Sequence, residues 1–293
     1  MKDVAKLAAY FIGIVIVGAL LAPILFWSAQ SLSAHGGFSF LSKYGFETFF
    51  HRSVLIAAAL LLWPLLRFSH VRSMADLGLE HNPRWGRDVC AGVLLSAIPL
   101  LCCCALLVAF HVYSFRHTFA WTRLGKALVA SITVPFIEEM FFRGIVLGVL
   151  LRTGRKYMAI LAVSAVFAAV HFFKAPERTS AIVTWLSGFN SIAHSFGRVD
   201  DPTMLASAFA TLFLFACILA VARVHTHSLW LPIGFHAGLI FASGTFSWLT
   251  HRQMVALPWL GKDLLVGIVP LCVAAITWII VRTWLKYDRA SSV

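Results

Sequence analysis

Hydrophobic residues occur along the chain in long runs that short polar segments separate. A helix needs about 20 mostly apolar residues to cross a bilayer, and eight runs reach or approach that length. These runs cover residues 8–27, 52–69, 90–111, 126–151, 157–173, 203–223, 229–249 and 264–283. The pattern predicts an all-α fold, a polytopic transmembrane bundle of about eight helices that forms a single membrane domain over residues 1–293.

Composition supports a membrane protein and excludes the soluble classes. The chain is 60% hydrophobic and only 12% charged, and its mean hydropathy is +0.86. A typical soluble domain is only about 45–50% apolar and carries about 25% charged residues, roughly twice the share found here. No polar connection is long enough for a soluble domain.

The net charge of +12 comes from 24 Lys and Arg against 12 Asp and Glu. These basic residues are spread over several loops, which argues against nucleic acid as a partner and leaves membrane lipid and a protein or peptide substrate. More Lys and Arg fall in the loops on the side of both termini than in the loops on the other side. By the positive-inside rule, we expect both termini in the cytoplasm.

The segment 174–202 contains apolar residues at steps of three and four. Such a pattern predicts an amphipathic helix that lies in the membrane interface, although a loop helix packed on the bundle fits it equally well. The apolar residues in question are Trp185, Leu186, Phe189, Ile192 and Phe196.

The fourth apolar run carries three charged residues in its interior, Glu138, Glu139 and Arg143, within the stretch "TVPFIEEMFFRGIVLGVLLR" that runs from Thr133 to Arg152. A charge at the bilayer centre costs at least about 2.5–3.5 kcal/mol, so it faces protein or water and usually marks function. Glu139 and Arg143 are four residues apart on a helix and can form an ion pair. Glu138 points about 100° away from Glu139, and we expect it to have a different partner.

Two histidines lie inside other predicted spans. His171 comes late in the fifth run, one turn after Phe167, and His236 lies in the seventh. A glutamate and two imidazoles are the groups needed to hold or activate a water molecule. Glycines four residues apart permit close helix contact, and they occur as Gly144 with Gly148 and as Gly234 with Gly238, around His236.

These residues carry a resemblance to a known family. "EEMFFR" (138–143) resembles the EExxxR motif of the CPBP family, which comprises CAAX-type prenyl endopeptidases and bacteriocin-processing membrane proteases often called Abi. "FAAVH" (167–171) resembles its FxxxH motif, and "LWLPIGFHAG" is similar to the segment around the histidine of its third motif. The three motifs occur in the family's order, and the resemblance covers roughly residues 75–245 as a protease-family core.

The resemblance implies an eight-helix intramembrane endopeptidase and a role for each matching residue. Glu138 would be the base that activates water, His171 and His236 its partners, and Glu139 with Arg143 a supporting pair. A Zn²⁺ ion bound by Glu138, His171 and His236 would be one scheme, and a metal-independent glutamate mechanism the other. The sequence looks like a bacterial one, which implies the inner membrane.

One departure from the family pattern concerns the third motif. It commonly places Asn or Asp four residues after its histidine, and this chain has Ile240 there. A non-catalytic immunity factor or scaffold that keeps the family fold is therefore an alternative, and a proton-coupled carrier is another. The motifs of three other intramembrane protease classes, HExxH, GxSG and GxGD, do not occur in the sequence.

Overall fold

The computed structural model describes residues 2–68, 73–80, 82–172, 182–195, 202–254, 258–261 and 264–290. The chain divides into two compact units. The first consists of Met1–Arg72 and Ala169–Asp200, and the second of Ser73–Ala168 and Asp201–Val293. Each unit is built almost entirely from helices, which confirms the predicted all-α membrane bundle.

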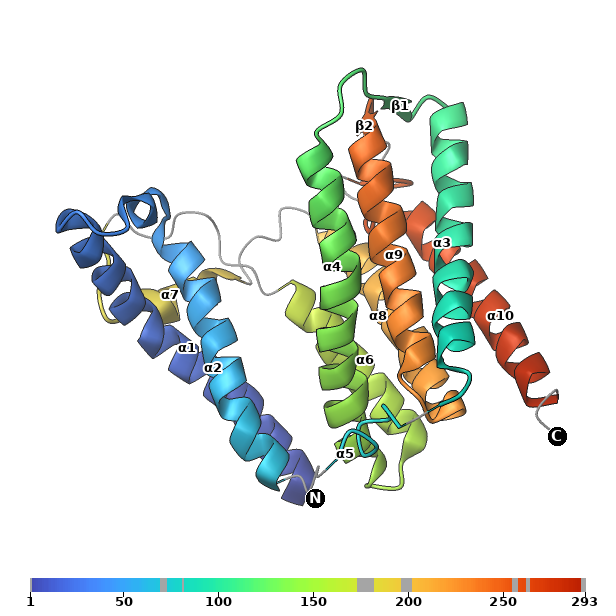
Figure 1. Cartoon of the computed structure of the whole chain (residues 1–293), viewed down its shortest axis with the longest axis horizontal. Helices are drawn as coiled ribbons and strands as arrows, with labels where there is room; N and C mark the ends of the chain where they lie inside the picture. The colour runs from blue at the N-terminus through green and yellow to red at the C-terminus, as the bar shows by residue number, and fades with distance from the viewer. Residues whose placement is uncertain are drawn as a thin grey trace. The chain divides into compact units, whose positions relative to one another are not determined.

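The first unit is an antiparallel pair of long helices with a short helix beside it (Figure 1). Its elements are α1 (Lys2–Ala34), the 3₁₀ helix η1 (Ser39–Lys43), α2 (Phe46–Phe68) and α7 (Ser187–Ser195). Ala19, Ala22, Phe46 and Phe50 form its core. The small residues of α1 allow this packing, since a Cβ on Gly18 would lie 2.9 Å from Val54 Cα.

Helix α7 falls within the segment predicted to form an interfacial helix. Trp185 and Leu186, just before it, are largely exposed at 59% and 65%, whereas Ile192 packs against the core of the first unit. The segment thus combines a packed side with exposed apolar residues. Phe196, the last residue of the predicted pattern, lies outside the described residues.

The second unit contains the remaining elements, and α9 lies between α3 and α4 (Figure 1). Helix α10 packs against α8 and α3, and a core cluster joins α8, α9 and α10 through residues such as Phe215, Leu231 and Val281. The elements are α3 (Trp85–Ala109), β1 (Tyr113–Phe115), α4 (Trp121–Glu139), the π-helix η2 (Met140–Val146), α5 (Leu147–Leu151), α6 (Lys156–His171), α8 (Pro202–Thr226), α9 (Trp230–Leu249), β2 (Thr250–Arg252) and α10 (Ile268–Ala290).

Each of the eight predicted spans contains a helix. Within the described part of the chain, five helices are long and apolar enough to cross a membrane, namely Asp3–Ala34, Phe46–Phe68, Trp85–Ala109, Pro202–Thr226 and Ile268–Tyr287. The fourth predicted span is interrupted by the π-helix η2, and the fifth is the shorter helix α6. The number of membrane passes therefore stays a prediction. Large apolar side chains such as Ile12, Leu60 and Ile279 are more than half exposed, as expected where lipid covers a helix.

A short antiparallel strand pair closes one end of the second unit (Figure 1). Tyr113 of β1 pairs with Arg252 of β2, and the Arg252 Nη2 donates to the Tyr113 hydroxyl at 2.6 Å. The apolar pattern did not predict these strands. They link the end of α3 to the end of α9, the two helices whose contact positions His236.

Candidate active site

The three charged residues of the fourth span lie where α4 passes into the π-helix η2. Glu138 and Glu139 end α4, and Arg143 is the fourth residue of η2. A π-helical turn contains one residue more than an α-helical turn, and such segments are frequent at functional sites. Glu139 and Arg143 are both fully buried at 0% exposure, and Glu138 is half-buried.

Glu139 and Arg143 form the ion pair that their spacing predicts. Arg143 Nη1 donates to Glu139 Oε1 at 3.0 Å, and Arg143 Nη2 donates to the Ala216 carbonyl oxygen of α8 at 3.3 Å. The guanidinium also lies over the Phe167 ring of α6, 4.3 Å from its centroid. Arg143 therefore connects three segments, and both of its charge-assisted hydrogen bonds are shielded from solvent.

His236 of α9 binds to the same carboxylate oxygen. Its Nδ1 lies 2.9 Å from Glu139 Oε1, and the residue is 8% exposed. A carboxylate oxygen only accepts, so Nδ1 carries the proton and donates it. In the neutral imidazole, Nε2 then has a free lone pair, and no described residue forms a hydrogen bond with it.

The position of His236 depends on a close contact between α9 and α3. A Cβ on Gly234 would lie 2.7 Å from Val89 Cα, and one on Gly238 would lie 2.9 Å from Val93 Cα. From the other side, a Cβ on Gly92 would lie 2.5 Å from the Leu231 oxygen. The backbones approach this closely because these positions lack a side chain, as the spacing of the glycines around His236 predicted.

The glycine pair on the fourth span behaves differently. A Cβ on Gly144 would lie 3.3 Å from Leu77 in the loop before α3, and one on Gly148 would meet nothing within 4 Å. Among the residues that the structure describes, no close helix contact forms at Gly148, although the spacing permits one. The sequence pattern is the same in both pairs, but only the pair on α9 faces another helix.

The remaining predicted residues have separate places in the structure. His171 is the last residue of α6 and belongs to the first unit, so its part in the site stays a prediction. Phe167, one turn earlier, belongs to the second unit, and its ring lies 6.0 Å from that of His236. Ile240 follows His236 by one turn of α9 and is half-buried.

The sequence did not indicate two contacts of the site. The resemblance implied His236 as a partner of Glu138, which stays a prediction, and the structure shows in addition a hydrogen bond between His236 and Glu139. The sequence also could not indicate the Ala216 carbonyl as an acceptor for Arg143, because a backbone carbonyl leaves no signal in the side-chain pattern. The sequence pattern marked Phe167 only because it lies one helical turn before His171.

The described residues do not assemble a metal site. No three His, Cys, Asp or Glu side chains among them gather closely enough to hold a metal ion. His236 itself can coordinate a metal ion through Nε2, because its Nδ1 is already hydrogen-bonded to the Glu139 carboxylate. Zinc binding by Glu138, His171 and His236 remains a prediction from the resemblance.

Comparison with known families gives one match, and it covers this site. Residues 119–242 match the family model described as "Type II CAAX prenyl endopeptidase Rce1-like". The matched segment runs from just before α4 into α9 and contains all five predicted site residues, which confirms the resemblance inferred from the three motifs. Comparisons with curated proteins and with solved structures gave no match.

Proposed function

We propose, from the match of residues 119–242 to the type II CAAX prenyl endopeptidases, that this chain is an intramembrane endopeptidase. It hydrolyses a peptide bond of a membrane-associated protein or peptide. One observation supports this most directly: inside the matched segment, a fully buried Glu139–Arg143 ion pair is bonded to His236 and directly follows Glu138. The apolar helices around it support a site within or next to the membrane.

A purely structural role explains this network poorly. Removing two charges from water costs several kcal/mol per ion, and a buried ion pair is often no more stable than apolar residues of similar size. In an apolar bundle, a chain selected for stability alone would have aliphatic residues at these positions. Ionisable groups inside a membrane bundle therefore indicate function.

In the proposed mechanism, Glu138 is the general base. It removes a proton from a water molecule while the water oxygen attacks the carbonyl carbon of the scissile peptide bond. The carbonyl oxygen becomes an oxyanion, and the protonated Glu138 then gives its proton to the leaving nitrogen as the C–N bond breaks. The resemblance implies His171 as a partner of Glu138, and we assign to it, as part of this proposal, stabilisation of the oxyanion.

Glu139 and Arg143 orient His236 for this reaction. Glu139 accepts a hydrogen bond from the Nδ1–H of His236, which fixes both the ring and its tautomer. The Nε2 lone pair can then accept a hydrogen bond from the attacking water and direct its other proton toward Glu138. Arg143 holds the Glu139 carboxylate in place through the same oxygen, Oε1.

A zinc ion, if bound by Glu138, His171 and His236, would supply a Lewis acid that polarises the water or the scissile carbonyl. None of the steps above depends on the ion.

A non-catalytic immunity factor or scaffold is the second candidate, and Ile240 is the observation that favours it. An aliphatic residue one turn after His236 cannot supply the polar group that the family pattern commonly has there. Such a protein would need the buried ion pair for helix packing but would not need Glu138 as a base.

Hydrolysis by the purified protein tests the proposal. Wild-type protein and Glu138→Gln would be reconstituted in vesicles and incubated with the detergent-solubilised membrane proteins of cells that lack the gene. We expect new peptide termini with the wild type and at least a hundredfold fewer with Glu138→Gln, because general base catalysis contributes about 10²–10⁴ in rate. Equal yields, with both proteins folded, would contradict the proposed role of Glu138, and no new termini with either protein would favour the scaffold.

A further inference from the structure

Exposed aromatic residues gather at the end of the second unit where β1 and β2 pair and α4 begins (Figure 1). The Trp248 ring of α9 contacts both Phe119 and Trp121, with ring centroids 5.2 Å apart in each pair. Trp121 is 69% exposed and Phe119 is 41% exposed. Helix α3, which is long and apolar enough to cross the membrane, also ends here. This end therefore lies at the level of the lipid headgroups, where aromatic side chains are enriched.

Two hydrogen bonds hold the loop before α4 against the end of α9. The Arg116 amide donates to the Leu249 carbonyl oxygen at 2.9 Å, and Trp248 Nε1 donates to the Ala120 carbonyl oxygen at 3.1 Å. The loop and its aromatic rings are thus positioned by the chain itself. A surface that is formed in advance loses less conformational entropy when it binds a ligand.

Three cations lie on this loop and on the first turns of α4. Arg123 and Lys126 are exposed and three residues apart, so they lie on the same side of the helix. Arg116 is half-buried, and its Nε atom is buried without an acceptor among the described residues. A fourth cation is already used within the chain, since Arg252 donates to the Tyr113 hydroxyl. Arg116, Arg123 and Lys126 therefore remain to bind an anion.

No carboxylate accompanies these three cations in the neighbouring sequence. The chain contains no Asp or Glu from residue 89 to 137 or from residue 202 to 262, and Asp263 lies outside the described residues. Arg123 does not stabilise α4, because a cation in the first turn opposes the helix macrodipole. On the predicted orientation, this end also lies outside the cytoplasm, where Lys and Arg are expected to be few. An anionic partner would explain why they are here.

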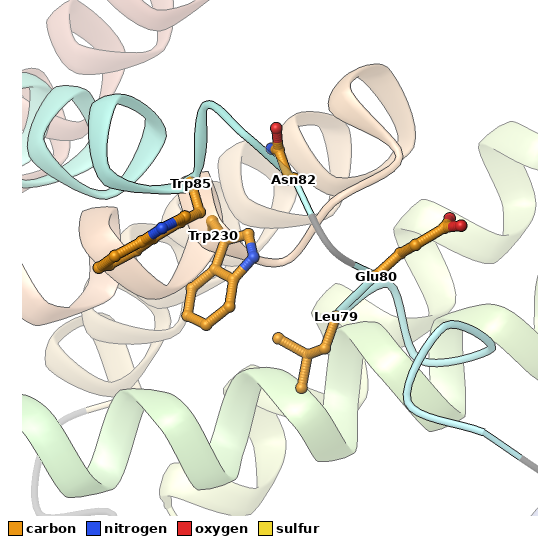
Figure 2. A pocket seen from close by; sticks show the side chains of 5 residues that line it. All are labelled: Leu79, Glu80, Asn82, Trp85 and Trp230. Carbon is orange, nitrogen blue, oxygen red and sulfur yellow. The ribbon is translucent and has the colours of Figure 1, made fainter.

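The tryptophans at the opposite end of the unit have a different charge environment. There a cavity of about 400 Å³ is lined by Leu79, Glu80, Asn82, Trp85 and Trp230 (Figure 2). The Glu80 carboxylate extends away from the two indole rings in this view, and Asn82 donates to the Asp88 carboxylate at 2.9 Å. Carboxylates at that end would repel an anion, so the end with β1 and β2 is the one that favours an anionic partner.

We infer that the β1–β2 end binds the headgroups of anionic phospholipids such as phosphatidylglycerol. The aromatic rings would lie among the glycerol groups and the first acyl carbons, and the cations would bind the phosphates, with Arg116 Nε donating to a phosphate oxygen. A zwitterionic lipid carries a cation beside its phosphate, so it gains less from this surface. We define the lipid patch by six residues: Arg116, Phe119, Trp121, Arg123, Lys126 and Trp248.

Native mass spectrometry of the full-length protein in detergent tests this inference. Phosphatidylglycerol and phosphatidylcholine with identical acyl chains would be titrated separately onto the delipidated protein. The main variant is Arg123→Gln/Lys126→Gln, because both side chains are exposed, and Arg116→Gln is the second variant. Arg155→Gln/Lys156→Gln is the matched control, since it removes two exposed cations at the opposite end of the unit.

We expect the wild type to bind phosphatidylglycerol at least tenfold more tightly than phosphatidylcholine. Each Lys or Arg near a membrane surface strengthens binding to anionic lipid about fivefold. Arg123→Gln/Lys126→Gln should therefore weaken the binding of the first phosphatidylglycerol by at least tenfold and Arg116→Gln by about fivefold. Neither should change the affinity for phosphatidylcholine, and the control should bind both lipids as the wild type does. Unchanged thermal midpoints would show that the exposed variants remain folded.

Four results would overturn the inference. Equal affinity of the wild type for the two lipids would make the patch a general lipid contact. An equal loss of phosphatidylglycerol binding in the control would show that the cations of this end have no special part. Displacement of the lipid by an oligoglutamate peptide would assign the patch to an acidic protein segment. Soluble glycerol phosphate that binds as tightly as the whole lipid would make the ligand a soluble one.

Discussion

Glu138 and Glu139 are adjacent in sequence but have different environments. Glu139 is fully buried and bonded to both Arg143 and His236, whereas Glu138 is half-buried one residue earlier. Their side chains point about 100° apart on the helix. The two carboxylates should therefore respond differently to the same substitution.

We predict that Glu139→Gln destabilises the protein far more than Glu138→Gln. Removing the Glu139 charge leaves Arg143 buried and uncompensated, and breaking a buried ion pair costs about 3–5 kcal/mol. Thermal unfolding in detergent should show a much lower midpoint for Glu139→Gln and a midpoint near the wild type for Glu138→Gln. Equal midpoints for the two variants would show that the ion pair is not needed for stability.

Phe167 should stabilise the site through Arg143. The guanidinium lies 4.3 Å from the ring centroid, and a cation–π contact shielded from water contributes about 2 kcal/mol. Phe167→Leu should lower the free energy of unfolding by about this amount, and peptide hydrolysis should fall with it. Phe167→Tyr keeps the aromatic face, so it is the control. A loss of the same size in Phe167→Tyr would instead indicate an effect of packing.

Residue spacing predicted the contacts within one helix better than those between helices. Glu139 and Arg143 are four residues apart, so any regular helix brings them together. The contact of His236 with Glu139 spans 97 residues and depends on how α9 packs against its neighbours. No local pattern encodes that arrangement, although the hydrophobic context of His236 marked it as a candidate.

At the scale of elements, the close contact between α3 and α9 positions His236. We predict that Gly234→Ala impairs both folding and hydrolysis, because its Cβ would lie 2.7 Å from Val89 Cα and the helices would have to separate. Gly148→Ala is the matched control on α5. Its Cβ would meet nothing within 4 Å, and alanine in a helix is more stable than glycine by about 0.5–1 kcal/mol. Yield and thermal midpoint would be compared, and a tolerated Gly234→Ala would contradict the proposed importance of this contact.

The apolar pattern located the helices but not their irregularities. All eight predicted spans contain a helix, because long apolar runs have few other folded states in a membrane. The π-helix η2 (Met140–Val146) was not predicted, since one additional residue in a turn leaves the apolar run unchanged. The strands β1 and β2 are three residues each, too short to give a period-two pattern.

At the scale of the whole molecule, the charge of the loops predicts that successive loops lie on alternate sides of the membrane. The two ends of the second unit agree with this prediction. The start of α3, the 152–155 and 227–229 turns and the end of α10 lie at one end of this unit, and the β1–β2 pair lies at the other (Figure 1). We predict that the first end faces the cytoplasm. A tag fused after residue 293 should resist protease added outside intact cells, and its digestion there would reverse the orientation.

The central claim is that the chain hydrolyses peptide bonds with Glu138 as the base. The most direct test compares the protein termini in membranes of cells that lack the gene and express the wild type or Glu138→Gln at matched levels. The account predicts termini that appear only with the wild type, and these would identify the substrate and the cleaved bond. Identical termini, with both proteins folded and equally abundant, would contradict it and favour the non-catalytic protein that Ile240 suggests.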